Sequence, residues 1–139
     1  MSGIAWLQKT DAPAALPPTS RALREPNGLL AVGGSLTPEW LVHAYRHGVF
    51  PWYSAGQPIL WWAPDPRAVL LAPVFRISRS LARSIRRRGF KTRIDTAFDA
   101  VIEACAGPRH GMAGTWITRE MHDAYATLHR RGLAHSFET

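Results

Sequence analysis

The segment from Gly48 to Leu70 constrains the fold of this chain most strongly, because large aromatic side chains alternate there with prolines. Proline fixes its own φ and disfavours helical backbone at the residue before it. We therefore expect a non-helical segment that loses less entropy on ordering than an ordinary loop and presents a rigid apolar wall. The residues that form the pattern are the aromatics Phe50, Trp52, Tyr53, Trp61 and Trp62 and the prolines Pro51, Pro58, Pro64 and Pro66.

Two interpretations of these rings stand side by side. Aromatic side chains bury large areas and dominate protein cores, so the first interpretation places each ring in the core. In the second, at least one ring faces a cleft and stacks on a base or side chain of a ligand. Stacking of one base on an aromatic ring contributes about 1–3 kcal/mol, so a single well-placed tryptophan would matter for binding.

Length and composition narrow the class of protein. A chain of 139 residues is enough for one large domain, or for one and part of a second. No apolar run approaches the roughly 18 residues of a membrane-spanning helix. The N-terminal residues lack the basic stretch followed by an apolar stretch that marks a signal peptide. These features predict a cytoplasmic protein without membrane contact.

The positive charge is concentrated in one short segment. Residues 76–93 carry eight basic side chains and no acidic one, whereas residues 1–75 carry five basic and four acidic ones and residues 94–139 carry four and six. This distribution is typical of a protein that binds a polyanion. The alternative is a solvated basic face without a partner.

A helix from Arg79 to Arg88 is expected within this basic segment, with Ser78 as its N-cap and Gly89 as its end. The spacing of its arginines places them on one exposed face, and the planar guanidinium group binds phosphate with two parallel hydrogen bonds. An apolar stripe lies on the other side of the helix. The arginines of the exposed face are Arg79, Arg83, Arg86 and Arg87.

Capping and periodicity predict three further helices and several short strands. The helices begin at Thr37, at Asp95 or Thr96, and at Thr118. The strands are expected at residues 29–32, 67–73, 90–94 and 134–139. This mixture indicates the α+β class.

Three side chains were considered for metal binding or nucleophilic chemistry. His43 and His47 lie four residues apart on a predicted helix, but a zinc site needs further ligands, so hydrogen-bonded surface histidines are favoured over a metal site. The single cysteine, Cys105, excludes an internal disulfide and a cysteine-based zinc site. On the apolar face of its helix, Cys105 is expected to be a buried, unreactive residue.

Five stretches of the sequence resemble, block by block and in order, the leucyl/phenylalanyl-tRNA–protein transferases, over about residues 16–138. Ser35 departs from the resemblance, since the family has aspartate after the Gly-Gly pair. The family also continues for roughly another hundred residues, within the usual size range of a domain, so we expect the natural protein to be longer. The stretches are REPNGLLAVGGSL, AYRHGVFPWYSAGQPILWWAPDPRAVL, ISRSLARSI, GTWIT and AYATLHRRGLAHS.

The resemblance implies a fold and an activity. Residues 1–65 would form a small N-terminal α/β domain, and residues 66–139 the first part of a truncated N-acetyltransferase-like domain. The family moves Leu, Phe or Met from aminoacyl-tRNA to the N-terminal Arg or Lys of an acceptor protein, which marks that protein for degradation by the N-end rule pathway. Since the aminoacyl ester is already activated, no cofactor and no metal are expected.

Site residues also follow from the resemblance. The residues that match Trp52 and Trp116 contact the terminal adenosine of the tRNA, and those that match Tyr45 and Tyr125 help to form the same site. The basic helix with Arg79, Arg83, Arg86 and Arg87 would bind the acceptor stem. The family's catalytic carboxylate and glutamine have no match here, so no catalytic residue is expected in this chain, and Asp65 and Glu103 are assigned no role.

Two other functions compete with this one. The chain could be an inactive fragment or a non-catalytic basic RNA-binding module, which a transfer assay with charged tRNA would distinguish. A CoA-dependent acetyltransferase would need a glycine-rich pyrophosphate loop that opens a helix, and this sequence contains none.

Overall fold

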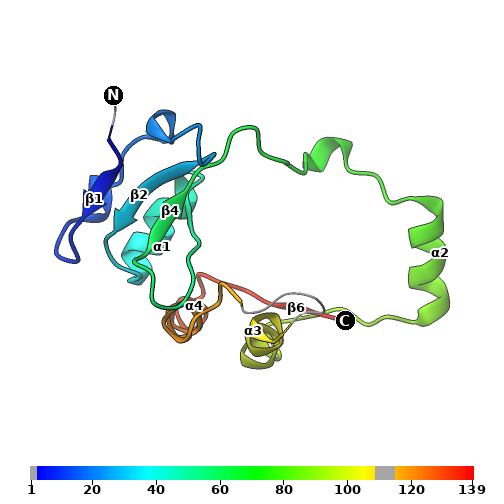
Figure 1. Cartoon of the computed structure of the whole chain (residues 1–139). Helices are drawn as coiled ribbons and strands as arrows, with labels where there is room; N and C mark the ends of the chain where they lie inside the picture. The colour runs from blue at the N-terminus through cyan, green and yellow to red at the C-terminus, as the bar shows by residue number, and fades with distance from the viewer. Residues whose placement is uncertain (1–2, 109–114) are drawn as a thin grey trace.

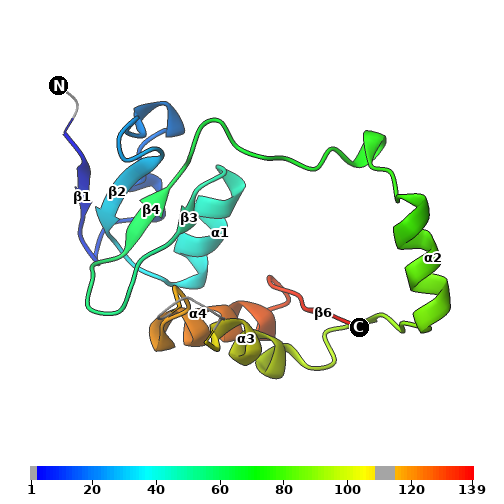
Figure 2. The ribbon, with the colours of Figure 1, turned by 45° about the vertical axis from the view of Figure 1, so that its right-hand side comes forward.

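The computed structural model describes residues 3–108 and 115–139. Its first part is built on a four-stranded sheet with strand order β1-β2-β4-β3 (Figures 1 and 2). Strand β1 pairs parallel with β2, whereas β4 pairs antiparallel with both β2 and β3. The strands are β1 (Ala5–Leu7), β2 (Leu29–Gly33), β3 (Phe50–Pro51) and β4 (Leu60–Trp62), and the 3-10 turns η1 (Pro13–Ala15) and η2 (Thr19–Arg21) connect β1 to β2.

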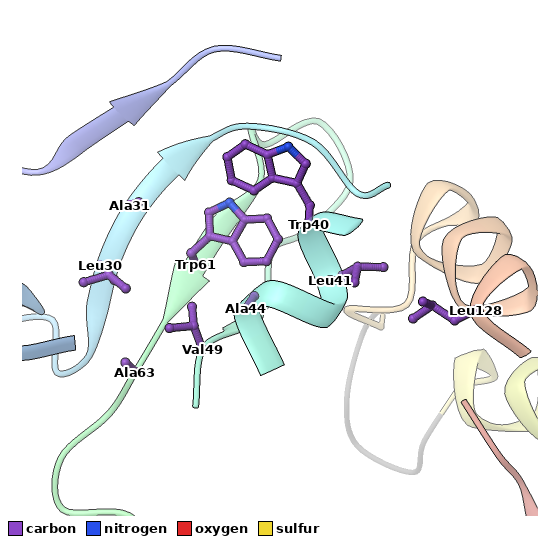
Figure 3. Close-up of a cluster of buried hydrophobic side chains, with 9 residues drawn as sticks. All are labelled: Leu30, Ala31, Trp40, Leu41, Ala44, Val49, Trp61, Ala63 and Leu128. Carbon is purple, nitrogen blue, oxygen red and sulfur yellow. The ribbon is translucent and has the colours of Figure 1, made fainter. Parts of the chain in front are cut away.

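Helix α1 (Pro38–Arg46) covers this sheet, and its contact with β4 forms the core. Figure 3 shows the ring of Trp40 from α1 beside the ring of Trp61 from β4, with ring centroids 5.8 Å apart. Trp61 is fully buried, and its indole N–H donates to the carbonyl oxygen of Gly33 at 2.8 Å. The buried ring therefore has its one polar group satisfied, as a buried indole requires.

Within residues 66–108 and 115–139, the second part contains three α-helices and a two-stranded sheet. The antiparallel pair of β5 and β6 joins residues 93–94 to residues 137–138. Helices α3 and α4 pack against each other, and Leu128 of α4 reaches the core of the first part beside Leu41 of α1 (Figure 3). The elements are η3 (Ala72–Val74), α2 (Arg79–Arg88), β5 (Arg93–Ile94), α3 (Phe98–Ala106), α4 (Arg119–Arg130) and β6 (Phe137–Glu138).

Helix α2 lies at the end of an extended arm, which we define as residues 64–92 between β4 and β5. Figures 1 and 2 show the helix separated from the sheet and from α4 in both views. Its apolar stripe is uncovered, since Ile77, Leu81 and Ile85 are 55%, 48% and 43% exposed. None of the described helices is both long enough and apolar enough to cross a bilayer.

Several local predictions are confirmed. The aromatic segment forms only short strands and loops, as its prolines require. Ser78 caps α2 by accepting the N–H of Leu81 at 3.2 Å. Thr118 caps α4 in the same way with the N–H of Met121, also at 3.2 Å.

The predicted strand over residues 67–73 is wrong. The backbone there is irregular and ends in the turn η3, because no strand of the described residues lies beside it to complete a hydrogen-bond ladder. The strand predicted at residues 90–94 is shorter than expected, since only Arg93–Ile94 pairs with β6.

The predicted start of α3 is also wrong. The helix begins at Phe98, and Ala97 precedes it without a side-chain cap. The carboxylate of Asp95 instead accepts the N–H of Ser136, the residue before β6, at 2.9 Å. Cys105 is exposed, contrary to the prediction, because it lines an open hollow beside α4 and β6 instead of a filled core.

Candidate functional site

The two predicted tryptophans lie next to each other. Trp52 follows β3 and Trp116 precedes α4, with ring centroids 6.3 Å apart and planes tilted by 48°. Trp52 is 56% exposed, and Trp116 is half-buried. The exposed ring of Trp52 offers an apolar face on which a base can stack, with the tilted ring of Trp116 beside it.

The backbone of Trp52 is held on both sides. Its N–H donates to the carbonyl oxygen of Leu60 at 2.9 Å, and its carbonyl oxygen accepts the indole N–H of Trp62 at 2.7 Å. Trp62 sits on β4, so the strand that carries the core also fixes the exposed ring. This arrangement explains how one segment supplies both kinds of ring: Tyr53 and Trp61 are buried, whereas Trp52 is exposed.

The two predicted tyrosines also meet, across helices α1 and α4. The hydroxyl groups of Tyr45 and Tyr125 are hydrogen-bonded, and the rings are nearly perpendicular at 84° with centroids 6.4 Å apart. Partial burial raises the pKa of Tyr45, although the hydrogen bond from Tyr125 and the charge of Arg67 oppose the shift. Burial and the neighbouring Tyr45 raise the pKa of Tyr125. Both hydroxyls are therefore neutral at physiological pH and able to donate or accept.

One residue from each aromatic pair lines the same pocket. Trp116 and Tyr125 both line an apolar hollow of about 320 Å³ between α3, α4 and β6. A hollow of this size lies at the lower end of the range for small-molecule sites. Sequence reasoning assigned its other lining residues, such as Phe98 and Met121, only to core faces, because periodicity cannot distinguish a packed face from an open one.

The arginines of α2 lie apart from these aromatic residues. All four predicted side chains are exposed, and within the described residues none forms an ion pair with a carboxylate. Figure 2 shows α2 far from α1 and α4, so the structure does not bring the arginine face and the aromatic rings into one continuous surface. The four side chains are Arg79, Arg83, Arg86 and Arg87.

A fifth arginine, which sequence reasoning missed, lies beside the rings. The guanidinium carbon of Arg67 is 5.0 Å from the centroid of the Phe50 ring, and Nη1 donates to the carbonyl oxygen of Gly48 at 2.7 Å. The signal that could have found it is its place inside the aromatic segment, since arginine readily lies over aromatic faces.

His43 of α1 and His47 at its C-cap lie side by side. The rings of His43 and His47 are 4.4 Å apart, and Nδ1 of His47 lies 2.7 Å from the carbonyl oxygen of His43. No cluster of three metal-binding side chains occurs in the described part of the chain. Burial, and then the charge of His47, lower the pKa of His43.

Comparison with known proteins decides the family. The model of the leucyl/phenylalanyl-tRNA protein transferases matches residues 69–139, and the model of their N-terminal domain matches residues 34–65. The chain belongs to the leucyl/phenylalanyl-tRNA protein transferase family. The resemblance found in the sequence is therefore confirmed.

Three similar proteins carry the name leucyl/phenylalanyl-tRNA–protein transferase. The one from Azoarcus sp. (strain BH72) is 60% identical over 136 residues, which cover 98% of this chain and 57% of the relative. The one from Pseudomonas fluorescens (strain Pf0-1) is 54% identical over 135 residues, which cover 97% of this chain and 59% of the relative. The one from Azotobacter vinelandii (strain DJ / ATCC BAA-1303) is 61% identical over 122 residues, which cover 88% of this chain and 54% of the relative. The chain thus spans little more than half the length of these transferases.

Proposed function

We propose that this chain is the tRNA-binding part of an aminoacyltransferase that moves Leu, Phe or Met from aminoacyl-tRNA to the N-terminal Arg or Lys of a protein. Family membership supports the reaction, and one structural observation supports the role of this part. That observation is the exposed ring of Trp52 beside Trp116, next to the hydrogen-bonded pair of Tyr45 and Tyr125. The terminal adenosine would stack on the tryptophans, and the tyrosines would complete the site.

The proposal includes the two-domain division at residues 1–65 and 66–139, the second being the first part of an N-acetyltransferase-like domain. The ranges of the two family models, which end at residue 65 and begin again at residue 69, support this division. Acceptor proteins marked in this way would enter N-end rule degradation. Charged tRNA is a cytoplasmic substrate, so the cytoplasm is the proposed location.

The proposed aminoacyl transfer depends on positioning the ester and the amine and does not require a cofactor. The aminoacyl ester is already activated, and holding ester and amine together supplies about 7–11 kcal/mol of the barrier reduction. The attacking α-amino group has a pKa near 8, so a weak base is sufficient to remove its proton. Within the described residues, the carboxylates of Asp65 and Glu103 form no ion pair that would orient them as a base. We therefore propose no catalytic residue within this chain and assign the proton transfer to the part that the longer relatives possess.

Binding of a charged-terminus analogue tests the role of the tryptophans. The probe is a 3′-amide of phenylalanyl-adenosine, which resists hydrolysis. We expect Trp52→Ala and Trp116→Ala each to weaken its binding by about 1–3 kcal/mol, because a stacking surface is lost. The matched control is Trp6→Ala, since Trp6 is 70% exposed on β1, outside the site. Equal affinities of all three variants, each folded by circular dichroism, would overturn the proposal.

A non-catalytic RNA-binding module is the second candidate. The observation that favours it is the separation of the arginine face of α2 from the aromatic rings. A transfer assay with charged tRNA and an Arg-starting peptide addresses it. We expect no transfer by the 139-residue chain alone. Transfer by this chain would contradict the assignment of the base to the part that only the longer relatives possess.

A further inference from the structure

The guanidinium group of Arg67 is held in a fixed place beside the aromatic rings. It lies over Phe50 at 5.0 Å and donates through Nη1 to Gly48 at 2.7 Å. An arginine has five N–H donors, and only one of them is used within the described residues. The side chain is exposed, so the remaining donors face solvent in an orientation that two contacts already define.

This cation belongs to the same row of rings as the proposed adenosine site. The centroid of Phe50 is 6.5 Å from that of Trp52, and the centroid of Trp52 is 6.3 Å from that of Trp116. Arg67 is therefore linked to Trp116 through two neighbouring rings, those of Phe50 and Trp52. Its charge also acts on the hydroxyl of Tyr45, whose pKa it lowers against the larger, raising effect of burial.

The proposed ligand carries a phosphate group that such a cation could bind. An adenosine stacked on Trp52 carries its 5′-phosphate one sugar ring away from the base. A guanidinium group matches phosphate oxygens with parallel N–H donors, and an immobilised one loses little entropy when it binds. The nearest acidic side chain in sequence, Asp65, forms no ion pair with Arg67 in the described part of the chain.

We propose that Arg67 binds the phosphate on the 5′ side of the terminal adenosine, so that this site recognises a nucleotide and not only a nucleoside. The proposal rests on the proposed function of the aromatic site. It adds a phosphate subsite next to the core of the molecule, distinct from the arginine face of α2.

The test compares two probes, the 3′-amide of phenylalanyl-adenosine with and without a 5′-phosphate, by calorimetry on the 139-residue chain. We expect the phosphorylated probe to bind about tenfold more tightly, as a charge-assisted hydrogen-bonded pair would give. Arg67→Gln should remove this ratio, because the phosphorylated probe loses more affinity than the unphosphorylated one. Arg67→Lys should keep part of it. The matched control is Arg76→Gln, an exposed arginine of the arm without an assigned role, which should keep the full ratio.

Three results would overturn the proposal, in distinguishable ways. Unchanged affinities for both probes in Arg67→Gln mean that the phosphate is bound elsewhere. An equal loss for both probes in Arg67→Gln and Arg67→Lys, with unfolded variants excluded by thermal melting, means that Arg67 only supports Phe50. Failure of the unaltered chain to bind either probe refutes the aromatic site itself, and the phosphate subsite with it.

Discussion

The first sheet and the arm place similar apolar patterns in opposite surroundings. In the sheet and α1, Leu41 and Trp61 are completely buried. In the arm, Leu81 and Ile85 form an apolar stripe on α2, yet they are 48% and 43% exposed. The comparison shows that helical periodicity identifies an apolar face but does not determine whether another helix or sheet packs against it. The four predictions that follow test the contrast, from the largest expected effect to the smallest.

The largest effect is expected from a change in the core. Trp61→Ala removes a fully buried ring, its stacking on Trp40 and its hydrogen bond to Gly33, so it should destabilise the fold by about 3–5 kcal/mol. Leu81→Ala on the arm should change the unfolding free energy by less than about 0.5 kcal/mol. Urea unfolding followed by circular dichroism measures both, and equal losses would contradict the exposure of α2.

The next effect concerns the charge of the arm. If three or four arginines of α2 contact phosphates, the affinity for a tRNA acceptor stem should fall with salt with a log–log slope of about −2 to −4. Arg83→Gln combined with Arg87→Gln should make that slope shallower by about 2. Filter binding over a fourfold range of salt, with Trp52→Ala as the control that keeps the slope, measures it. A flat response of the unaltered chain would exclude the arm as the phosphate-binding face.

Helix caps provide a smaller but matched pair of changes. Thr118 caps α4, which packs on the core, so Thr118→Ala should cost about 1 kcal/mol of global stability. Ser78 caps α2 with the same geometry, but this helix shares no core. Ser78→Ala should therefore leave the global unfolding midpoint unchanged and only speed amide exchange within α2. A shift of the midpoint in Ser78→Ala would show that the arm unfolds together with the core.

The smallest effect concerns the second sheet, where polar contacts replace an apolar core. Nδ1 of His135 lies 2.6 Å from the carboxylate of Asp95, and His129 lies 3.7 Å from it. The hydrogen bond from His135, followed by that from the N–H of Ser136, lowers the pKa of Asp95. The hydrogen bond and then the charge of Asp95 raise the pKa of His135.

The sign of the resulting pH dependence is different for the two groups. The stabilisation of the folded state by protonated His135 is complete below its ordinary pKa of 6.5. It is lost as the pH rises through the raised pKa. The stabilisation by ionised Asp95 is present above its ordinary pKa of 3.8 and is lost as the pH falls through the lowered pKa. Amide protection at Asp95 and Ser136, corrected for intrinsic exchange, should thus be greater at about pH 6 than at about pH 8.5. His135→Gln should abolish the difference, and a difference that persists in this variant would assign it to another group.

Much of the local structure was predictable because its causes are local. Proline excluded helix from the aromatic segment, and the hydroxyls of Ser78 and Thr118 marked two helix starts. The proposed site residues Trp52 and Trp116 came from the family resemblance, and the structure places them side by side. Their role in binding stays a prediction.

The predictions that failed depended on distant partners. Residues 67–73 have the composition of a strand, but no neighbouring strand completes a ladder within the described residues. Asp95 has the chemistry of a helix cap, but its carboxylate binds the N–H of Ser136, which lies far along the chain. Arg67 was overlooked because its contacts with Gly48 and Phe50 exist only after β3 and β4 pair.

The sequence by itself determined which segments are helical, where the charge lies and which rings share a rigid segment, because these properties depend on neighbours along the chain. Only the tertiary structure decided which of the rings became core and which became surface. Trp61 and Trp62 are adjacent, yet the first is fully buried and the indole of the second supports the exposed Trp52. The physical reason is the pleat of the strand, which sends successive side chains to opposite faces, while packing on α1 selects the face that is covered.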